Sequence, residues 1–191
     1  MTNNFRAFII TLILIFGLQS SSMAEDIKDF EIEGVSVGDS LLKYMSEEAI
    51  LDDLEYIYPN DGFWAVTYIT NKKFENYENV LFHGKKNDSN YYIHSITGDL
   101  FFSNTSECLK KKKEINATIK NAYPNIFTED IKKKHENDSK TTTYTTWYDF
   151  ESGSIAVACY DWSKKSGHKK TTKVTIDSKE FLNWLNYKAY D

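Results

Sequence analysis

The chain has 191 residues, of which 41% are hydrophobic and 27% charged, and its formal net charge at pH 7 is −5. Its only arginine is Arg6, so this acidic chain lacks the basic, arginine-bearing surface that nucleic-acid binding requires. Nucleic acid is therefore excluded as a partner, and the length suffices for a domain with a buried core.

Residues 1–24 have the pattern of a signal peptide. One positive charge at Arg6 precedes an apolar run at residues 7–18, and Ser22 and Ala24 supply small residues at the −3 and −1 positions of a cleavage site. The apolar run is shorter than the roughly 20 residues that a membrane-spanning helix needs. We therefore predict cleavage after Ala24, no membrane span in the mature chain, and a periplasmic or secreted location.

The remaining residues, 25–191, are predicted to form one domain. They hold 28 acidic residues against 22 lysines, a net charge of −6, and two cysteines, Cys108 and Cys159, that lie 51 positions apart. No C-x-x-C pair or histidine spacing typical of zinc occurs, so we predict neither a metal nor another cofactor. In an oxidising compartment the pair favours a disulfide, which is worth about 4 kcal/mol for a loop of this length. Two buried free thiols are the alternative.

The first half of the domain reads as an extended segment, a helix and strands. Apolar residues recur near a 3.6-residue period over residues 41–57, which predicts a helix with Ser46 as an N-cap that divides it. Pro59 is expected to end this helix, because the residue before proline avoids the helical conformation. Aromatic and β-branched runs predict strands at residues 63–70, 78–85 and 90–103, the last with an alternative reversal at residues 97–99.

The second half repeats this order. Residues 105–123 predict a helix that Pro124 ends, and a polar stretch at residues 126–141 leads to further strands. These strands are predicted at residues 141–150, 154–162 and 169–176, the first two as a hairpin. Asp177 is predicted to cap a last helix, with Glu180 three residues on as in a capping box.

Both prolines of the chain lie in the tripeptide Tyr-Pro-Asn, at residues 58–60 and 123–125. Two interpretations stay open: a tandem duplication with halves 25–103 and 104–191, or two unrelated helices that each stop at a proline. On either interpretation the elements predict an α+β domain with an antiparallel sheet of about six strands and helices packed mainly on one face. Cys108 in the middle helix would then be bonded to Cys159 in a central strand.

Two patterns suggest catalysis. Residues 38–41 spell Gly-Asp-Ser-Leu, the block that names the GDSL serine hydrolases, which makes Ser40 a candidate nucleophile. A serine needs a positioned base and a carboxylate, and the D-x-x-H block expected in that class does not occur, so a helix cap is the other interpretation of Ser40. His83 and His94 lie on neighbouring predicted strands, where they form either a base or metal pair or two ordinary strand histidines.

Aromatic residues suggest a binding surface. Trp147 and Tyr148 are adjacent, so on a strand they point to opposite faces, whereas Tyr160 and Trp162 alternate onto a common face. An exposed row of such rings would suit a sugar or a partner protein.

Residues 26–50, together with "ECLKKKKEI" at 107–115 and "CYDW" at 159–162, resemble a group of small, uncharacterised secreted proteins of marine alphaproteobacteria, a group without an assigned activity. The stretch "EGVSVGDSLLKYM" is more distantly similar to the start of the outer-membrane-assembly lipoproteins and the β-lactamase-inhibitor proteins. That resemblance implies helices packed on an antiparallel sheet. The acylated cysteine of the lipoproteins is lacking here.

These observations favour a non-catalytic periplasmic or secreted binding or protein-interaction module, with an unknown envelope protein or small ligand as partner. The alternative is a secreted GDSL-like esterase that uses Ser40.

Overall fold

The computed structural model describes residues 26–67 and 75–191. The predicted signal peptide, residues 1–24, lies outside the described residues, as do residues 68–70 of the first predicted strand.

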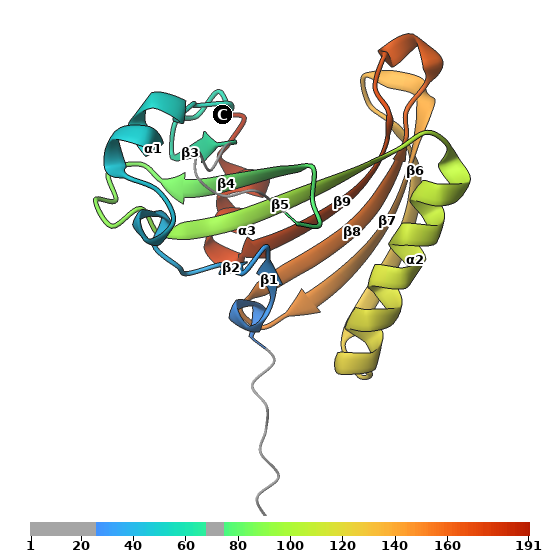
Figure 1. The fold of residues 1–191 in the computed structure, drawn as a ribbon, viewed down its shortest axis with the longest axis horizontal. Helices are drawn as coiled ribbons and strands as arrows, with labels where there is room; N and C mark the ends of the chain where they lie inside the picture. Colours follow the sequence, from blue (N-terminus) through green and yellow to red (C-terminus); the bar gives the residue numbers. More distant parts are fainter. Residues whose placement is uncertain (1–25, 68–74) are drawn as a thin grey trace, which may run out of the picture.

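The main element is a seven-stranded antiparallel sheet with the strand order β3-β4-β5-β9-β8-β7-β6 (Figure 1). Two meanders, β3 to β5 and β6 to β9, meet where β5 pairs with β9. The strands are β3 (Phe63–Val66), β4 (Asn79–Lys85), β5 (Ile93–Phe102), β6 (Phe127–His135), β7 (Asp138–Phe150), β8 (Gly153–Asp161) and β9 (Lys170–Ser178). The predicted α+β class with an antiparallel sheet is confirmed, and the strand number is close to the prediction.

Helical elements and a small hairpin complete the fold. The helices are α1 (Glu47–Asp53), α2 (Thr105–Ala122) and α3 (Lys179–Tyr187), with 3-10 turns at Ile27–Asp29, Leu41–Lys43 and Lys164–Ser166. The hairpin consists of β1 (Glu31–Ile32) and β2 (Val35–Ser36). Helix α2 carries the chain from β5 to the far edge of the sheet, and Figure 1 shows α2 in front of the sheet and α3 behind it.

Alternation along strand β8 explains why the two faces of the sheet differ. Ile155, Val157 and Cys159 point to the face covered by the N-terminal segment, α1 and α2, where the main hydrophobic core lies. The intervening residues, Ala156 and Ala158, are small and point to the opposite face. Among the described residues, helix α3 covers one end of that second face, where Phe181 packs on His83.

The disulfide Cys108–Cys159 joins α2 to strand β8, as predicted, with a Cα–Cα distance of 5.8 Å. Both cysteines are fully buried. The hydroxyl of Thr172 on β9 donates a hydrogen bond of 2.9 Å to the carbonyl oxygen of Cys108. The covalent bond and this hydrogen bond together fix α2 across two central strands.

The helix that Pro59 was predicted to end stops earlier, so that prediction is wrong. Helix α1 ends at Asp53, and Leu54 is extended because Glu55 exchanges backbone hydrogen bonds of 2.9 and 2.7 Å with Ala65. Ser46 caps α1 as predicted, by accepting a hydrogen bond from the amide of Ala49. The second proline fits its prediction, since α2 ends at Ala122, two residues before it.

Three other details differ from the sequence prediction. Strand β5 runs unbroken through residues 97–99, and residues 127–135, expected as a polar connection, form edge strand β6. Asp177 is a residue of β9 rather than the cap of the last helix. Ser178 is the cap, and its hydroxyl accepts a hydrogen bond of 3.1 Å from the amide of Phe181. The side chain of Asp177 is therefore free for another role.

Candidate ligand-binding site

The face of the sheet opposite α2 is hollowed into a cavity of about 590 Å³, which we call the hollow. Its lining comes from strands β4 to β9, with Tyr58, Phe181 and Leu185 at the end that α3 covers. The hollow exists because Ala156 and Ala158 leave a low floor on β8, while larger side chains rise from the strands on either side.

Strand register places four polar residues side by side at the α3 end of this face. His83 on β4 lies opposite Ser95 on β5, Ser95 lies opposite Asp177 on β9, and Asp177 lies opposite Ser154 on β8. We call these four residues the inner polar row. Each is buried, with no more than 6% of its surface exposed, and His83, Ser95 and Asp177 line the hollow.

Polar atoms in the inner polar row lack hydrogen-bond partners among the described residues. They are both ring nitrogens of His83, the hydroxyls of Ser95 and Ser154, and Oδ1 of Asp177. A buried polar atom without a partner costs about 1–3 kcal/mol, and folded proteins contain few of them. Several such atoms in one row beside a cavity require an explanation, and a ligand or ordered water that completes their hydrogen bonds is one.

Burial sets the protonation of this row. It raises the pKa of Asp177 to about 7, an effect that the nearby Ser95 hydroxyl only partly offsets without making a hydrogen bond of normal geometry. Burial also lowers the pKa of His83 to about 4, and the positive charge of Lys173 adds to this. Near pH 6 both side chains are therefore mostly uncharged, so the imidazole and the carboxyl group can each donate and accept hydrogen bonds.

The middle of the hollow is rich in hydroxyl groups. Thr97 and Thr175 face each other on β5 and β9 with their hydroxyl oxygens 3.2 Å apart. Two residues further along each strand, Asp99 and Lys173 form an ion pair with an N–O distance of 3.5 Å. Trp147 on β7 lies opposite Ala156, which leaves space beside its indole ring.

The outer end of the face carries an aromatic cluster. Tyr160 and Trp162 are stacked with ring centroids 5.3 Å apart and an interplanar angle of 16°. The rings of His135 and His168 pack against Trp162 with centroids 5.1 and 5.0 Å away. We call these four residues the outer aromatic cluster. A second cavity of about 420 Å³ adjoins the hollow here, and Tyr160 and Lys173 line both.

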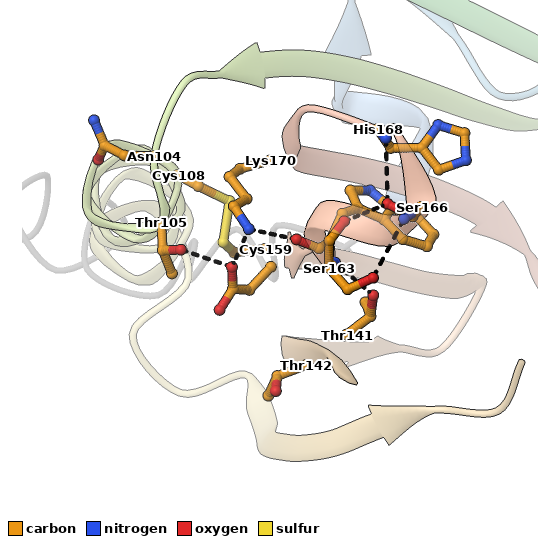
Figure 2. A network of polar contacts seen from close by, with 12 residues as sticks. Asn104, Thr105, Cys108, Thr141, Thr142, Cys159, Ser163, Ser166, His168 and Lys170 are labelled. Carbon is orange, nitrogen blue, oxygen red and sulfur yellow. Dashed lines mark hydrogen bonds and ion pairs between the residues drawn. A yellow bond between two sulfur atoms is a disulfide. The ribbon is translucent and has the colours of Figure 1, made fainter. Parts of the chain in front are cut away.

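Hydrogen bonds hold the loop that presents Trp162 and His168 (Figure 2). The amide of Ser163 donates to the Thr141 hydroxyl over 2.9 Å, and the amide of His168 donates to the Ser166 hydroxyl over 3.2 Å. Lys170 donates to the Trp162 carbonyl and forms an ion pair of 2.7 Å with Asp161. Trp162 itself donates from Nε1 to the Thr171 hydroxyl over 3.2 Å. The cluster is thus anchored to strands β7, β8 and β9.

The aromatic residues singled out in the sequence lie as predicted. Tyr160 and Trp162 share one face, and Trp147 and Tyr148 point to opposite faces. Trp147 lines the hollow, whereas Tyr148 is completely buried in the core on the α2 side.

His83 and His94, for which a pair was one of two interpretations, lie on neighbouring strands but have different partners. His83 is opposite Ser95, and its ring packs on Phe181 with centroids 4.8 Å apart. The Nδ1 atom of His94 lies 3.3 Å from the hydroxyl of Ser178 and 3.7 Å from the carboxylate of Glu180.

Ser40, the candidate nucleophile, is bonded to the backbone. Its hydroxyl donates a hydrogen bond of 2.6 Å to the carbonyl of Asn90 and accepts one of 3.3 Å from the amide of Leu42. These bonds make Ser40 the cap of the 3-10 turn Leu41–Lys43, which is the second interpretation that the sequence allowed. Within residues 26–67 and 75–191, the hydrogen bonds of this hydroxyl include none to a histidine.

Sequence reasoning singled out His83 and the aromatic residues Trp147, Tyr160 and Trp162, but it missed the other three members of the inner polar row. Asp177 was predicted to be a helix cap, and no sequence pattern around Ser95 or Ser154 indicated a binding site. The alternation of small and large residues along β8 was the one available indication that the face opposite the core is not filled.

The described residues lack two features that would point to other functions. They contain no cluster of three or more histidine, cysteine or acidic side chains placed to hold a metal ion. No helix among them is both long and apolar enough to cross a membrane.

Comparison with known proteins gives no match, whether to a family model, to a curated protein or to a solved structure.

Proposed function

We propose that the protein is an exported, non-catalytic binding module whose hollow takes up a small polar ligand. One observation carries the proposal: polar atoms of His83, Ser95 and Asp177 are buried beside the cavity and have no hydrogen-bond partner within the part of the chain that the structure describes. A ligand that supplies those partners would recover part of the free energy that their burial costs. The disulfide is compatible with the oxidising compartment that export implies.

The inner polar row contains the residue types of a serine-hydrolase triad, but their order does not suit catalysis. In a triad the histidine lies between the serine and the acid and is hydrogen-bonded to both. Here Ser95 lies between the other two, so His83 and Asp177 are two strands apart, about 10 Å. Neither nitrogen of His83 has a partner within the described residues, which leaves Ser95 without a base. This order favours binding over hydrolysis.

The test is a substitution on strand β8 that fills part of the hollow. In Ala158→Leu the larger side chain projects from β8 into the cavity, whereas Ala122→Leu adds the same atoms at an exposed position of α2. Each protein is mixed with fractionated small-molecule extract from the producing cells, and its thermal unfolding is recorded. A ligand at 100 times its Kd stabilises the fold by about 2.7 kcal/mol.

We expect a stabilising fraction for the unmodified protein and for Ala122→Leu, and a loss of that stabilisation in Ala158→Leu. Equal stabilisation of all three proteins would place the ligand outside the hollow and refute the proposal.

A further inference from the structure

We propose that the ligand of the hollow is an uncharged oligosaccharide that lies along strand β9, from the inner polar row to the outer aromatic cluster. This inference rests on the proposed function and specifies its ligand class. It is carried by the charge balance, the hydroxyl content and the placement of aromatic rings on one open sheet face.

Charges on this face are balanced. The hollow is lined by two lysines, Lys133 and Lys173, and by the carboxylate of Glu136, while Asp177 is mostly uncharged near pH 6. Lys173 is also paired with Asp99, and its ammonium lies 5.9 Å from the centre of the Tyr160 ring. A cavity without an excess of one sign gives no electrostatic preference for a charged ligand. The face therefore suits an uncharged molecule.

Hydroxyl groups from several strands line the hollow among apolar side chains. Side chains of Ser95 and of four threonines line the hollow, and each hydroxyl can donate one hydrogen bond and accept others. The threonines are Thr97, Thr143, Thr145 and Thr175. The hydroxyls of Thr97 and Thr175 already bond each other, and that of Thr143 donates to the carbonyl of Lys133. The Ser95 hydroxyl has no partner among the described residues, and a purely apolar ligand would leave it without one, which costs free energy. Sugar hydroxyls both donate and accept, so they match this lining.

Aromatic rings supply the complementary surface. A pyranose ring carries its hydroxyls at the edge and exposes C–H groups on its faces, so it binds best between a flat apolar surface and groups that bond its rim. Trp147 provides such a surface beside the hydroxyl of Thr175, because Ala156 separates the two residues across the sheet. At the outer end, the stacked rings of Tyr160 and Trp162 line the second cavity and continue the aromatic surface.

The length of the face sets the size of the ligand. Asp177 and Thr171, the β9 residues at the two ends, are six residues apart, which corresponds to about 20 Å along a strand. This distance accommodates several sugar units. Affinity should therefore rise from a disaccharide to a tetrasaccharide, because only the longer chain reaches both the inner polar row and Tyr160.

The experiment titrates the full chain, exported and purified from a periplasm, with defined probes. The uncharged probes are di- and tetrasaccharides of α-1,4-glucose, β-1,4-glucose and β-1,4-N-acetylglucosamine, and the contrasting probes are oligogalacturonate and laurate. Calorimetry measures affinity. The variants are Trp147→Ala and the smaller change Thr175→Val, with circular dichroism as the check of folding. Tyr187→Ala is the matched control, since Tyr187 is 74% exposed on α3 and does not line the hollow.

We expect at least one uncharged tetrasaccharide to bind more tightly than its disaccharide. Trp147→Ala and Thr175→Val should each weaken it about tenfold or more, which corresponds to about 1.4 kcal/mol, and Tyr187→Ala should leave it unchanged. Binding of only oligogalacturonate or laurate, or of none of the probes at millimolar concentration, overturns the carbohydrate inference.

The Ala158→Leu variant then separates the two proposals. If it abolishes binding of some other ligand, the hollow remains the site and only the ligand class is wrong. If it changes the binding of no ligand, the proposed function fails as well.

Discussion

Replacing Asp177 by asparagine should make the protein more stable at alkaline pH but not at acid pH. The carboxyl group is 3% exposed, and burial raises its pKa to about 7 from an ordinary value of 3.8. Between these two values the unfolded chain has already released the proton that the folded chain still holds, so stability falls as the pH rises. A pKa difference of about three units corresponds to a loss of about 4 kcal/mol in the free energy of unfolding. This loss is complete above pH 7 and absent below pH 4.

His83 has the opposite effect on how the free energy of unfolding depends on pH. Its pKa is about 4 in the folded protein and 6.5 as a model value, so the unfolded chain takes up a proton first as the pH falls. The free energy of unfolding therefore decreases from about pH 6.5 to pH 4, by about 3 kcal/mol. In the unmodified protein the two contributions nearly cancel over this range. The Asp177→Asn variant lacks the contribution of Asp177, so its free energy of unfolding should show the pH dependence that His83 causes.

The measurement is urea unfolding, with the disulfide intact, of the unmodified protein and of Asp177→Asn from about pH 4 to pH 8. The difference in unfolding free energy between the two should grow with pH, by up to about 4 kcal/mol in favour of the variant. Asp149→Asn is the control, because Asp149 continues the inner polar row across β7 but is exposed. Curves for Asp177→Asn that run parallel to the unmodified protein at every pH would refute the burial argument.

Two further predictions concern the covalent link and the candidate nucleophile. Replacing both Cys108 and Cys159 by alanine should lower the free energy of unfolding by about 4 kcal/mol. The variant should therefore unfold at a lower urea concentration than the oxidised protein, and an unchanged midpoint would contradict this prediction. Ser40→Ala should cost about 1 kcal/mol through loss of the helix-turn cap while leaving any hydrolysis of p-nitrophenyl acetate unchanged; hydrolysis that disappears in this variant would support the esterase interpretation instead.

The elements that the sequence predicted well are those in which one face is apolar. Strands β7, β8 and β9 each bury one side in the main core, which gives them apolar and β-branched runs. The disulfide was predicted because the chain has two cysteines and the pattern of a signal peptide. Edge strand β6 was missed because it pairs on one side only and its residues, including three successive lysines, are mostly exposed. Such a strand has no apolar alternation to detect, and its lysines are typical of a protected sheet edge.

Gly98 shows how one residue supports two interpretations. In the sequence a glycine beside Thr97 and Asp99 suggested a reversal of the chain. In the structure it lies within β5, and a Cβ atom at this position would come 2.5 Å from the ring of Tyr77. The glycine is needed for the close approach of that ring, not for a turn. Only the position of Tyr77, 21 residues earlier in the chain, distinguishes a turn at Gly98 from a strand.

The candidate site was harder to predict because it depends on register. His83, Ser95, Asp177 and Ser154 form a row only when four strands align in one specific way, and a shift of one residue in any strand would turn its member to the other face. Asp177 was also obscured locally, since Asp-Ser-Lys-Glu matches a capping box and Ser178 supplies the cap one residue later.

Helix α3 connects the stability of the fold with the properties of the hollow. Its apolar residues Phe181 and Trp184 pack on Phe63 with ring centroids 5.2 and 4.8 Å apart, so a separate small core holds the helix in place. In that position Phe181 lies over His83 and keeps water from the inner polar row. Exclusion of water raises the cost of an ionised Asp177, and it strengthens each hydrogen bond that a ligand makes there. A variant that loosens α3 should therefore lower the pKa of Asp177 and weaken ligand binding together.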